Sequence, residues 1–314
     1  MKILNVLKAF IYDRIEAVEV LEDGHINSSV LVKGRELYVL QCMNNRLYSN
    51  YLDELEHNYL KYRAACEKLY KNPGEWYCPD WIKDREGRFF HKDSDGNIWR
   101  LYRYIPSDDQ HGACENTYSI GKGLGKLHKV LRECTDIKTI GSTAHLHDLT
   151  YHYDKYRMQD SSVMERIEEI DRFILNNIES MLSITVPEGG VIHGDAKVGN
   201  MLFKGGEVIG FIDLDTLMHG SLYDDIADCM RSCCIDDRGD VDSDRATKLY
   251  CGYEDGSESR LSEDEISLIG RNLSRNRFML GLRYYTDYLS GEGYFSGSPA
   301  QKLEKVRALY TIIK

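Results

Sequence analysis

The sequence predicts an α+β protein of two lobes, an antiparallel-sheet lobe with one helix followed by a larger, chiefly helical lobe. Three observations support this. Short strand patterns separated by turn residues occupy residues 25–104, apolar residues at helical spacing dominate after residue 106, and one strand pair is embedded in the helical half. We place the boundary so that residues 1–106 form the N-terminal lobe and residues 107–314 the C-terminal lobe.

The first lobe begins with a predicted β-hairpin. Its strands are HINSSVLV and LYVLQCM, joined by turn residues from Lys33 to Glu36. A helix is expected over residues 51–70, from the spacing of Leu52, Leu55, Tyr59 and Tyr62. Aromatic-rich segments around Phe89 and over residues 98–104 then flank the turn SDGN, as antiparallel strands do.

The second lobe shows five long helical patterns. We expect them near residues 115–133, 163–184, 222–235, 262–290 and 300–313. The embedded strands NMLFK and EVIGFID flank Gly205 and Gly206, which predict a two-residue hairpin turn.

Composition narrows the class of partner. The net charge of −11 argues against a surface that binds nucleic acid or anionic lipid, because both need Lys and Arg to meet phosphates. No run reaches the roughly 18 apolar residues that span a bilayer, and the start lacks the cleavage site of an exported protein. Nine scattered cysteines favour thiols in a reducing compartment. We expect a cytoplasmic monomer or weak homodimer that binds a small molecule, with no nucleic-acid or membrane partner.

The segment from His193 to Asn200 has the form H-x-D-x-K-x-x-N, and Asp213 follows Asn200 by thirteen residues. Phosphoryl transfer needs a carboxylate that accepts or orients the attacking hydroxyl proton. It also needs an amide oxygen and a second carboxylate to hold the Mg²⁺ that spans the nucleotide phosphates. Asp195, Asn200 and Asp213 fit these roles.

The hairpin geometry gives a testable register. With a two-residue turn at Gly205 and Gly206, Asn200 is predicted to lie opposite Phe211, with Asp213 as its diagonal neighbour on the same face. Lys197 would offset charge on the transferred phosphoryl group, and His193 would brace the loop. The alternative is a surface hairpin in which these polar residues only form turns.

The motifs HGDAKVGN and FIDLDT resemble the aminoglycoside phosphotransferase and choline kinase superfamily, which has a two-lobed protein-kinase-like fold. The segments GHINSSVLV, WRLYRYI and GLRYYTDYLSGEGYF are similar to one branch, the N-acetylhexosamine 1-kinase-like sugar kinases. Together these motifs extend over nearly the whole chain.

The resemblance implies an ATP- and Mg²⁺-dependent kinase of carbohydrate metabolism. It assigns Asp195 as the base, Asn200 and Asp213 as metal ligands, and backbone groups at Tyr104 and Ile105 to the adenine. Arg283 and Tyr294 are implied to approach the sugar. Arg283 could equally be a solvated helix arginine, and Tyr294 could serve packing.

The chain departs from the family in the nucleotide site. Gln41 stands where many kinases carry a strand lysine, and a neutral amide cannot neutralise phosphate. Lys33, Arg35 or Arg46 could supply the missing charge. The loop from Asp23 to Asn27 offers one glycine, so phosphate binding there would need help from Asn27 or Ser28.

We therefore expect transfer of the ATP γ-phosphoryl group to a sugar hydroxyl, with the anomeric hydroxyl of an N-acetylhexosamine or related hexose as acceptor. One alternative keeps the chemistry and changes the acceptor to an aminoglycoside or a choline-type amine. Another is a nucleotide-binding pseudokinase or scaffold, which Gln41 and the sparse glycine loop favour and the intact acidic motif opposes.

Overall fold

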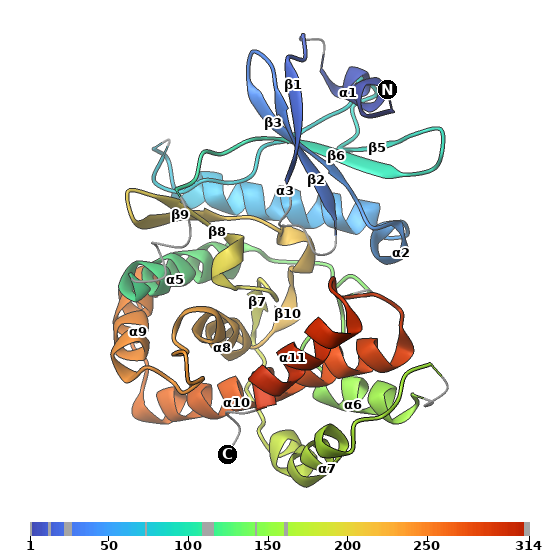
Figure 1. The fold of residues 1–314 in the computed structure, drawn as a ribbon. Coiled ribbons are helices and arrows are strands. Elements are labelled where there is room, and N and C mark those ends of the chain that lie inside the picture. Colours follow the sequence, from blue (N-terminus) through green and yellow to red (C-terminus); the bar gives the residue numbers. More distant parts are fainter. Residues whose placement is uncertain are drawn as a thin grey trace.

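The computed structural model describes residues 2–11, 14–21, 27–72, 74–108, 116–141, 143–159 and 163–310 (Figure 1). Its N-terminal lobe is an antiparallel sheet in the order β1-β2-β3-β6-β4, with β5 also paired to β6. The strands are β1 (Ala17–Leu21), β2 (Ser28–Lys33), β3 (Leu37–Cys42), β4 (Trp81–Ile82), β5 (Phe90–Lys92) and β6 (Ile98–Arg103). The helices are α1 (Lys2–Phe10), α2 (Asn45–Tyr48) and α3 (Leu52–Leu69).

Apolar side chains cover both faces of this sheet. On one face, Val32, Leu40 and Leu101 are fully buried against α1. On the other, the Tyr59 ring of α3 stacks on the Trp81 ring at a centroid distance of 4.0 Å. The expected hairpin, helix and later strands of this lobe are therefore present.

The C-terminal lobe is chiefly helical. Its helices are α5 (Thr117–Glu133), α6 (Leu149–Arg157), α7 (Glu168–Leu182), α8 (Leu222–Cys233), α9 (Ser243–Ser257), α10 (Glu263–Ser290) and α11 (Pro299–Tyr310). Short strands β7 (Gly190–Ile192) and β10 (Met218–Gly220) pair with each other, as do β8 (Met201–Lys204) and β9 (Glu207–Phe211). The structure thus confirms the predicted α+β class, although the sequence analysis predicted neither α1, α6 nor α9.

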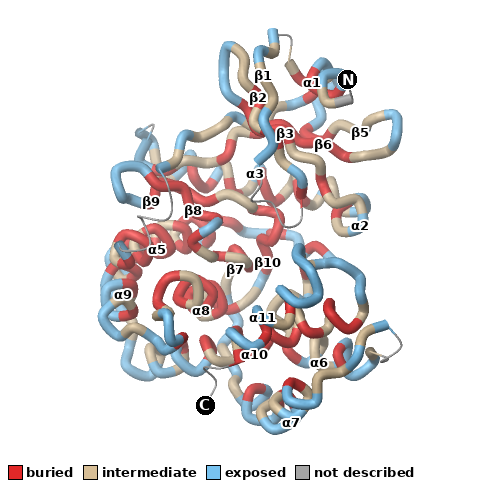
Figure 2. The backbone as a smooth tube through the Cα atoms, in the orientation of Figure 1, coloured by how far each residue is buried: buried red, intermediate tan, exposed pale blue. Residues whose placement is uncertain are grey.

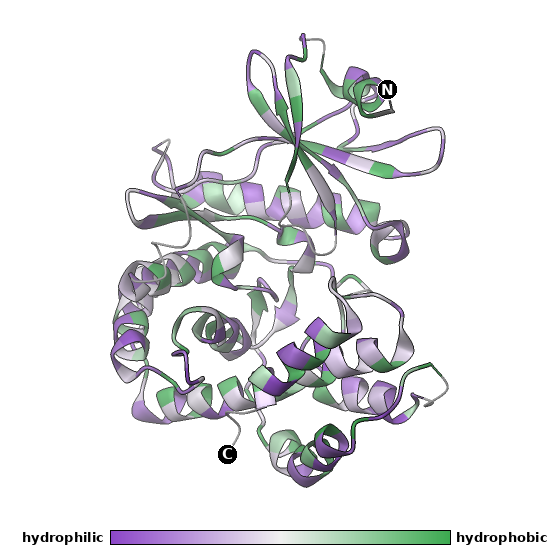
Figure 3. Cartoon of the chain, in the orientation of Figure 1, coloured by the Kyte–Doolittle hydropathy of each residue, from purple (hydrophilic) through white to green (hydrophobic). Residues whose placement is uncertain are grey.

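Helix α8 lies at the centre of this lobe and is almost entirely buried (Figure 2). The helices around it carry mixed apolar and polar residues (Figure 3), as amphipathic helices at a surface do. Helices α5 and α9 approach closely through glycines. A Cβ on Gly121 would lie 2.0 Å from the Leu249 carbonyl oxygen, and one on Gly256 equally close to that of Lys122.

The β8–β9 hairpin lies between the sheet and the helices (Figure 1). Phe203 and Val208 are buried in the same apolar cluster as Leu124 of α5. The other side of the hairpin contacts the first lobe, where the Tyr77 N–H donates to the Ile209 carbonyl at 2.6 Å. The hairpin is therefore fixed from both lobes.

None of the helices in the described ranges has both the length and the hydropathy needed to cross a bilayer.

Candidate active site

The loop from His193 to Asn200 connects β7 to β8 and is fixed from below by Asp225 of α8. This buried carboxylate accepts hydrogen bonds from the backbone N–H groups of His193 and Gly194, at 2.7 and 2.9 Å. His128 contacts the same carboxylate at 3.1 Å. Burial alone would raise the pKa of Asp225, but hydrogen bonding and the charge of His128 hold it below its usual value. Asp225 braces the loop, while Ser221 caps α8.

A second set of contacts shapes the loop from inside. The His193 ring accepts from the Asp195 N–H at Nδ1, so its Nε2–H donates to the Ile212 carbonyl at 3.0 Å. The Thr216 hydroxyl donates to the His193 carbonyl at 2.7 Å. Gly194 has φ of +81°, and a Cβ there would lie 2.6 Å from the Thr216 carbonyl oxygen, so the turn requires glycine. These contacts tie the loop to the segment after β9.

Asp195 is held by two neighbours. Its Oδ2 accepts from Lys197 Nζ at 2.7 Å and from Asn200 Nδ2 at 2.8 Å. The same Asn200 amide group donates to the Asp195 carbonyl at 2.7 Å. Burial acts to raise the pKa of Asp195, but the charge and hydrogen bond of Lys197 lower it below its ordinary value. Asp195 is therefore an ionised carboxylate at neutral pH, in a fixed orientation.

The predicted hairpin register is wrong by one residue. The two-residue turn exists, with Lys204 opposite Glu207, but Met201 rather than Asn200 lies opposite Phe211. A bulge causes the shift, because Ile209 is inserted between the partners of Leu202 and Phe203. Asn200 instead sits in a short 3₁₀ turn, and its carbonyl accepts the Ile212 N–H.

Asp213 follows the bulged strand in the left-handed conformation, with φ of 61°. No hydrogen bond or ion pair to its carboxylate is found among the described residues. Burial, followed by the negative charges of Asp215 and Asp195, raises the pKa of Asp213 to about 6. The charges of Lys197 and Arg100 act in the opposite direction, but neither side chain forms an ion pair with this carboxylate.

This donor set fits Mg²⁺. An amide side chain and an unpaired carboxylate are hard oxygen ligands, and a cation would offset the repulsion that raises the pKa of Asp213. Within the described part of the chain, no cluster of three His, Cys, Asp or Glu side chains could hold a metal, and this includes the cysteines of α8. A site with few protein ligands suits Mg²⁺, because the ion keeps several waters and also binds phosphate oxygens.

The cation beside Gln41 is Arg100, which was not among the predicted candidates Lys33, Arg35 and Arg46. Gln41 of β3 and Arg100 of β6 are directly paired, and the guanidinium donates to the Gln41 amide oxygen. Arg100 also donates to both oxygens of Asp215, at 2.6 and 3.0 Å. Its guanidinium lies 4.3 Å from the Trp81 ring centroid. Lys33 instead forms an exposed ion pair with Glu19.

The other expected nucleotide residues lie along the same lobe. Asn27 is buried, and its side chain accepts from the Asn44 N–H at 2.9 Å, whereas Ser28 is exposed at the start of β2. The Tyr104 N–H donates to Leu37, so only its carbonyl and the backbone of Ile105 remain for adenine. Residues 22–26 of the expected phosphate loop lie outside the described residues.

Arg283 and Tyr294 come together although they belong to different segments. The guanidinium of Arg283 in α10 lies 3.5 Å from the Tyr294 hydroxyl and over the Phe295 ring. Burial, and then the charges of Asp215 and Asp213, raise the pKa of Tyr48, and Tyr294 adds to this shift. Tyr294 is therefore within electrostatic reach of the region between the lobes.

Sequence reasoning missed other supports of the site. His147 Nε2 contacts the Gly194 carbonyl at 2.9 Å, and the Ser232 hydroxyl accepts from the Val198 N–H at 3.0 Å. No local pattern marks either residue. For Arg100 a signal exists, because a charged residue stands amid the apolar strand residues Ile98, Trp99 and Leu101.

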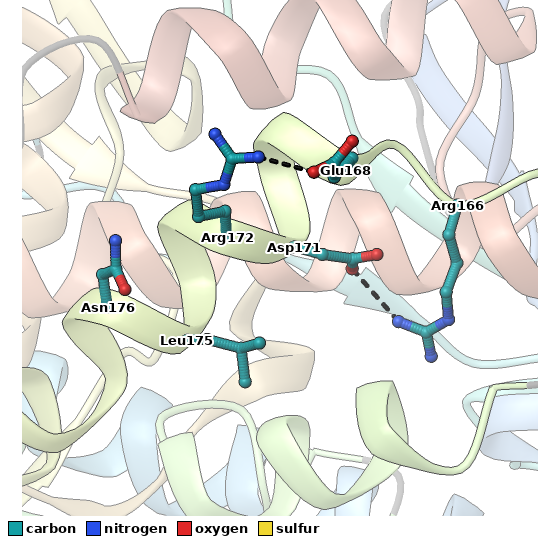
Figure 4. A pocket seen from close by; sticks show the side chains of 6 residues that line it. All are labelled: Arg166, Glu168, Asp171, Arg172, Leu175 and Asn176. Carbon is teal, nitrogen blue, oxygen red and sulfur yellow. Dashed lines mark hydrogen bonds and ion pairs between the residues drawn. The ribbon is translucent and has the colours of Figure 1, made fainter.

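A hollow of about 390 Å³ on α7 is unrelated to this site (Figure 4). Its charges are already paired, Arg166 with Asp171 and Arg172 with Glu168. A second cavity, between α8, α10 and α11, is considered below.

Comparison with known proteins gives a match to a family. Residues 17–257 match APH, the phosphotransferase enzyme family.

Curated relatives match over part of their length. A homoserine kinase of Sinorhizobium fredii is 30% identical over 121 residues, which is 38% of this chain and 36% of that protein. A homoserine kinase of Agrobacterium fabrum is 24% identical over 202 residues, 62% of this chain and 59% of that protein. The chain thus matches between about a third and three fifths of these relatives.

Solved structures share the fold. The amicoumacin kinase hAmiN, in complex with AMP-PNP, Ca²⁺ and Ami, has a TM-score of 0.66 at 13% identity, covering 98% of this chain and 92% of that chain. A microcompartment-associated aminopropanol kinase also has a TM-score of 0.66, at 14% identity, covering 99% and 94%. Aminoglycoside 2'-phosphotransferase-IIIa, in its GDP complex, has a TM-score of 0.61 at 14% identity, covering 95% and 93%.

Proposed function

The chain belongs to the APH phosphotransferase enzyme family, and we propose that it transfers the γ-phosphoryl group of ATP to a hydroxyl group of a small molecule. One observation carries the proposal. An ionised Asp195, oriented by Lys197 and Asn200, lies beside the unpaired carboxylate of Asp213. This is the set of groups that phosphoryl transfer requires.

In this proposal residues 1–106 hold the nucleotide and residues 107–314 hold the catalytic loop and the acceptor. Asn200 and Asp213 would bind Mg²⁺, which when bound neutralises charge on the phosphate oxygens. The backbone at Tyr104 and Ile105 would face adenine. Asn27 directly precedes β2, Ser28 begins β2 and Gln41 lies on β3, and these residues would cover the phosphates.

The residues of the loop suggest how the transfer proceeds. Asp195 orients the acceptor hydroxyl and takes its proton. The acceptor oxygen forms a bond to the γ-phosphorus as the bond to the β–γ bridging oxygen breaks, and ADP leaves. Lys197, with Nζ 2.7 Å from Asp195 Oδ2, offsets charge on the transferred oxygens.

The leading acceptor is a sugar hydroxyl, with the anomeric hydroxyl of an N-acetylhexosamine or related hexose as first choice. The contact between Arg283 and Tyr294 supports a sugar acceptor. A guanidinium can donate hydrogen bonds to sugar hydroxyl groups, and the neighbouring tyrosine ring can pack against the sugar ring. A hydroxy amino acid is the second candidate, since the curated relatives are homoserine kinases. Aminoglycosides and choline-type amines follow as alternatives.

The test is a coupled ADP-release screen over N-acetylglucosamine, N-acetylgalactosamine, glucose, galactose, homoserine, choline and kanamycin. Asp195→Asn should lower kcat with the active acceptor by about 10²–10⁴ and leave the Kd for Mg-ATP almost unchanged. A fully active Asp195→Asn protein would refute the role of Asp195. Binding of Mg-ATP without turnover on any acceptor would favour a scaffold.

A further inference from the structure

A cavity of about 550 Å³ lies between the end of α8, the loop after it, α10 and α11. Both polar and apolar side chains line it. Four of the lining residues are cationic and two acidic: Arg231, Arg238, Arg277, Lys305, Asp236 and Asp237. The lining therefore carries an excess of positive charge, although the whole chain has a net charge of −11.

Arg277 is the unusual member of this lining. It is only 4% exposed, and its Nη1 donates to the Gly239 carbonyl at 3.0 Å. Its buried Nε has no hydrogen-bond partner, and among the described residues no carboxylate forms an ion pair with it. Burial, and then the positive charge of Arg231, lower the pKa of Arg277 to about 10. The negative charge of Asp240 acts in the opposite direction but forms no ion pair with Arg277. Buried charges are ordinarily in direct pairs, so this guanidinium lacks a directly bonded anion.

Its neighbour Arg231, in contrast, has a carboxylate partner. Arg231 donates through Nε and Nη2 to a single oxygen of Asp228, at 2.9 and 2.8 Å. Both donors use Oδ1 of Asp228, and Oδ2 of this carboxylate is buried without a hydrogen-bond partner among the described residues. The two arginines thus differ, because Arg231 is in a direct ion pair and Arg277 is not.

The cavity lies close to the catalytic loop. Arg231 adjoins Ser232, whose hydroxyl holds the Val198 N–H at 3.0 Å. The negative charge of Asp195 contributes to the raised pKa of Arg231, after burial, which lowers it, and Asp228, which raises it. Tyr284, which lines the cavity, lies within the electrostatic reach of Lys197. The cavity is thus linked to the catalytic loop through Arg231 and Ser232, and an acceptor held in it has to extend from there to Asp195.

We propose that this cavity binds the carboxylate of the phosphate acceptor, with Arg277 as its counterion. The acceptor is then a hydroxyl compound that also bears an acid group, such as a hexuronic acid or a hydroxy amino acid. The inference rests on the proposed function and narrows its substrate class. Guanidinium N–H groups suit a carboxylate because they can bind both of its oxygens.

The first test uses matched pairs of acceptors that differ in charge only, galacturonate with galactose and homoserine with its amide. For at least one pair, we expect the unaltered protein to give kcat/KM at least about 10-fold higher for the acid. Arg277→Met should raise KM for that acid on the order of 100-fold and leave KM for the neutral member and for ATP nearly unchanged. Arg277→Lys, which keeps the charge, should restore part of the loss.

Arg271→Met is the matched control, because Arg271 lies on the same helix but is exposed and outside the cavity. It should change neither KM. Equal rates for acid and neutral members in the unaltered protein would overturn the proposal. So would an Arg277→Met protein that loses both activities alike, since that result indicates a purely structural arginine.

Calorimetric titration separates this inference from the proposed function. The same four compounds are titrated into the unaltered protein and into Arg277→Met. Tighter binding of an acid, lost in the variant, supports the cavity even when no compound is phosphorylated, and the kinase proposal alone then fails. Acids that bind no better than their neutral partners overturn the cavity proposal whether or not turnover occurs.

Discussion

Arg100 in the N-terminal sheet and Arg277 in the C-terminal helices are equally buried, at 3% and 4% exposure, yet their surroundings differ. Arg100 has both oxygens of Asp215 and the Gln41 amide as partners, and Trp81 beneath it. Arg277 has one carbonyl as its hydrogen-bond partner, and the charge of Asp240 acts on it without an ion pair. The first charge is balanced by a direct ion pair and the second is not.

The difference indicates a structural role for Arg100 and a different one for Arg277. Arg100 connects β6 of one lobe to Asp215, two residues after Asp213 in the other, so it fixes the position of the acidic segment. It lies beside Gln41, where a strand lysine was expected, but its hydrogen bonds are to protein groups. Arg277 lines a cavity, where we propose that it is the counterion of an acceptor carboxylate.

The largest effect is expected for Arg100→Met. Removing one partner of a buried ion pair leaves Asp215 charged and unpaired, which costs about 3–5 kcal/mol. Urea unfolding should show this loss in the free energy of unfolding. The double variant Arg100→Met with Asp215→Leu should recover much of the stability. A single variant as stable as the unaltered protein would show that the two side chains are not coupled.

His152 is a half-buried basic group that stays neutral instead of finding a charged partner. Burial, and then the positive charge of Arg283, lower the pKa of His152 to about 3, from an ordinary value of 6.5. The unfolded chain therefore binds a proton below about pH 6.5 that the folded chain does not, so stability falls as pH drops. Between pH 7 and 5 this contributes a loss of about 2 kcal/mol.

The measurement compares urea unfolding of the unaltered protein and His152→Asn at both pH values. The variant should lose less stability over this interval, because its amide does not titrate. If both proteins respond identically to pH, His152 is not neutral in the folded state.

For Arg277→Met we expect a smaller effect on stability than for Arg100→Met. Methionine removes a buried charge that has no carboxylate partner, so the free energy of unfolding should stay within about 1 kcal/mol or rise. Thermal unfolding without acceptor is the measurement. A loss as large as that of Arg100→Met would erase the contrast between the two arginines.

The smallest effect is expected for Lys33→Met. Lys33 was one candidate for the missing strand cation, but it is exposed and paired with Glu19. Exposed pairs contribute about 0.2–1 kcal/mol, so stability should change little and KM for ATP should stay constant. A large rise in that KM would return Lys33 to the nucleotide site.

The sequence predicted the α+β class and the long helices other than α9, because their apolar periodicity is strong. It marked the loop from His193 to Asn200 as the candidate catalytic loop because His193, Asp195 and Asn200 form a local motif. It failed on the hairpin register, since the bulge at Ile209 leaves no mark in the pattern of residues. Helix α6 escaped notice because it is short and polar, with LTYHYDKYR as its sequence.

The chain alone therefore predicted the candidate catalytic groups and most of the elements that carry them, since both depend on neighbours in sequence. Only the tertiary structure decided which charges meet. Arg100 and Asp215 are 115 residues apart, and Asp225 reaches His193 from a separate helix. Electrostatic interactions depend on distance and burial, and these are fixed only when the lobes fold together.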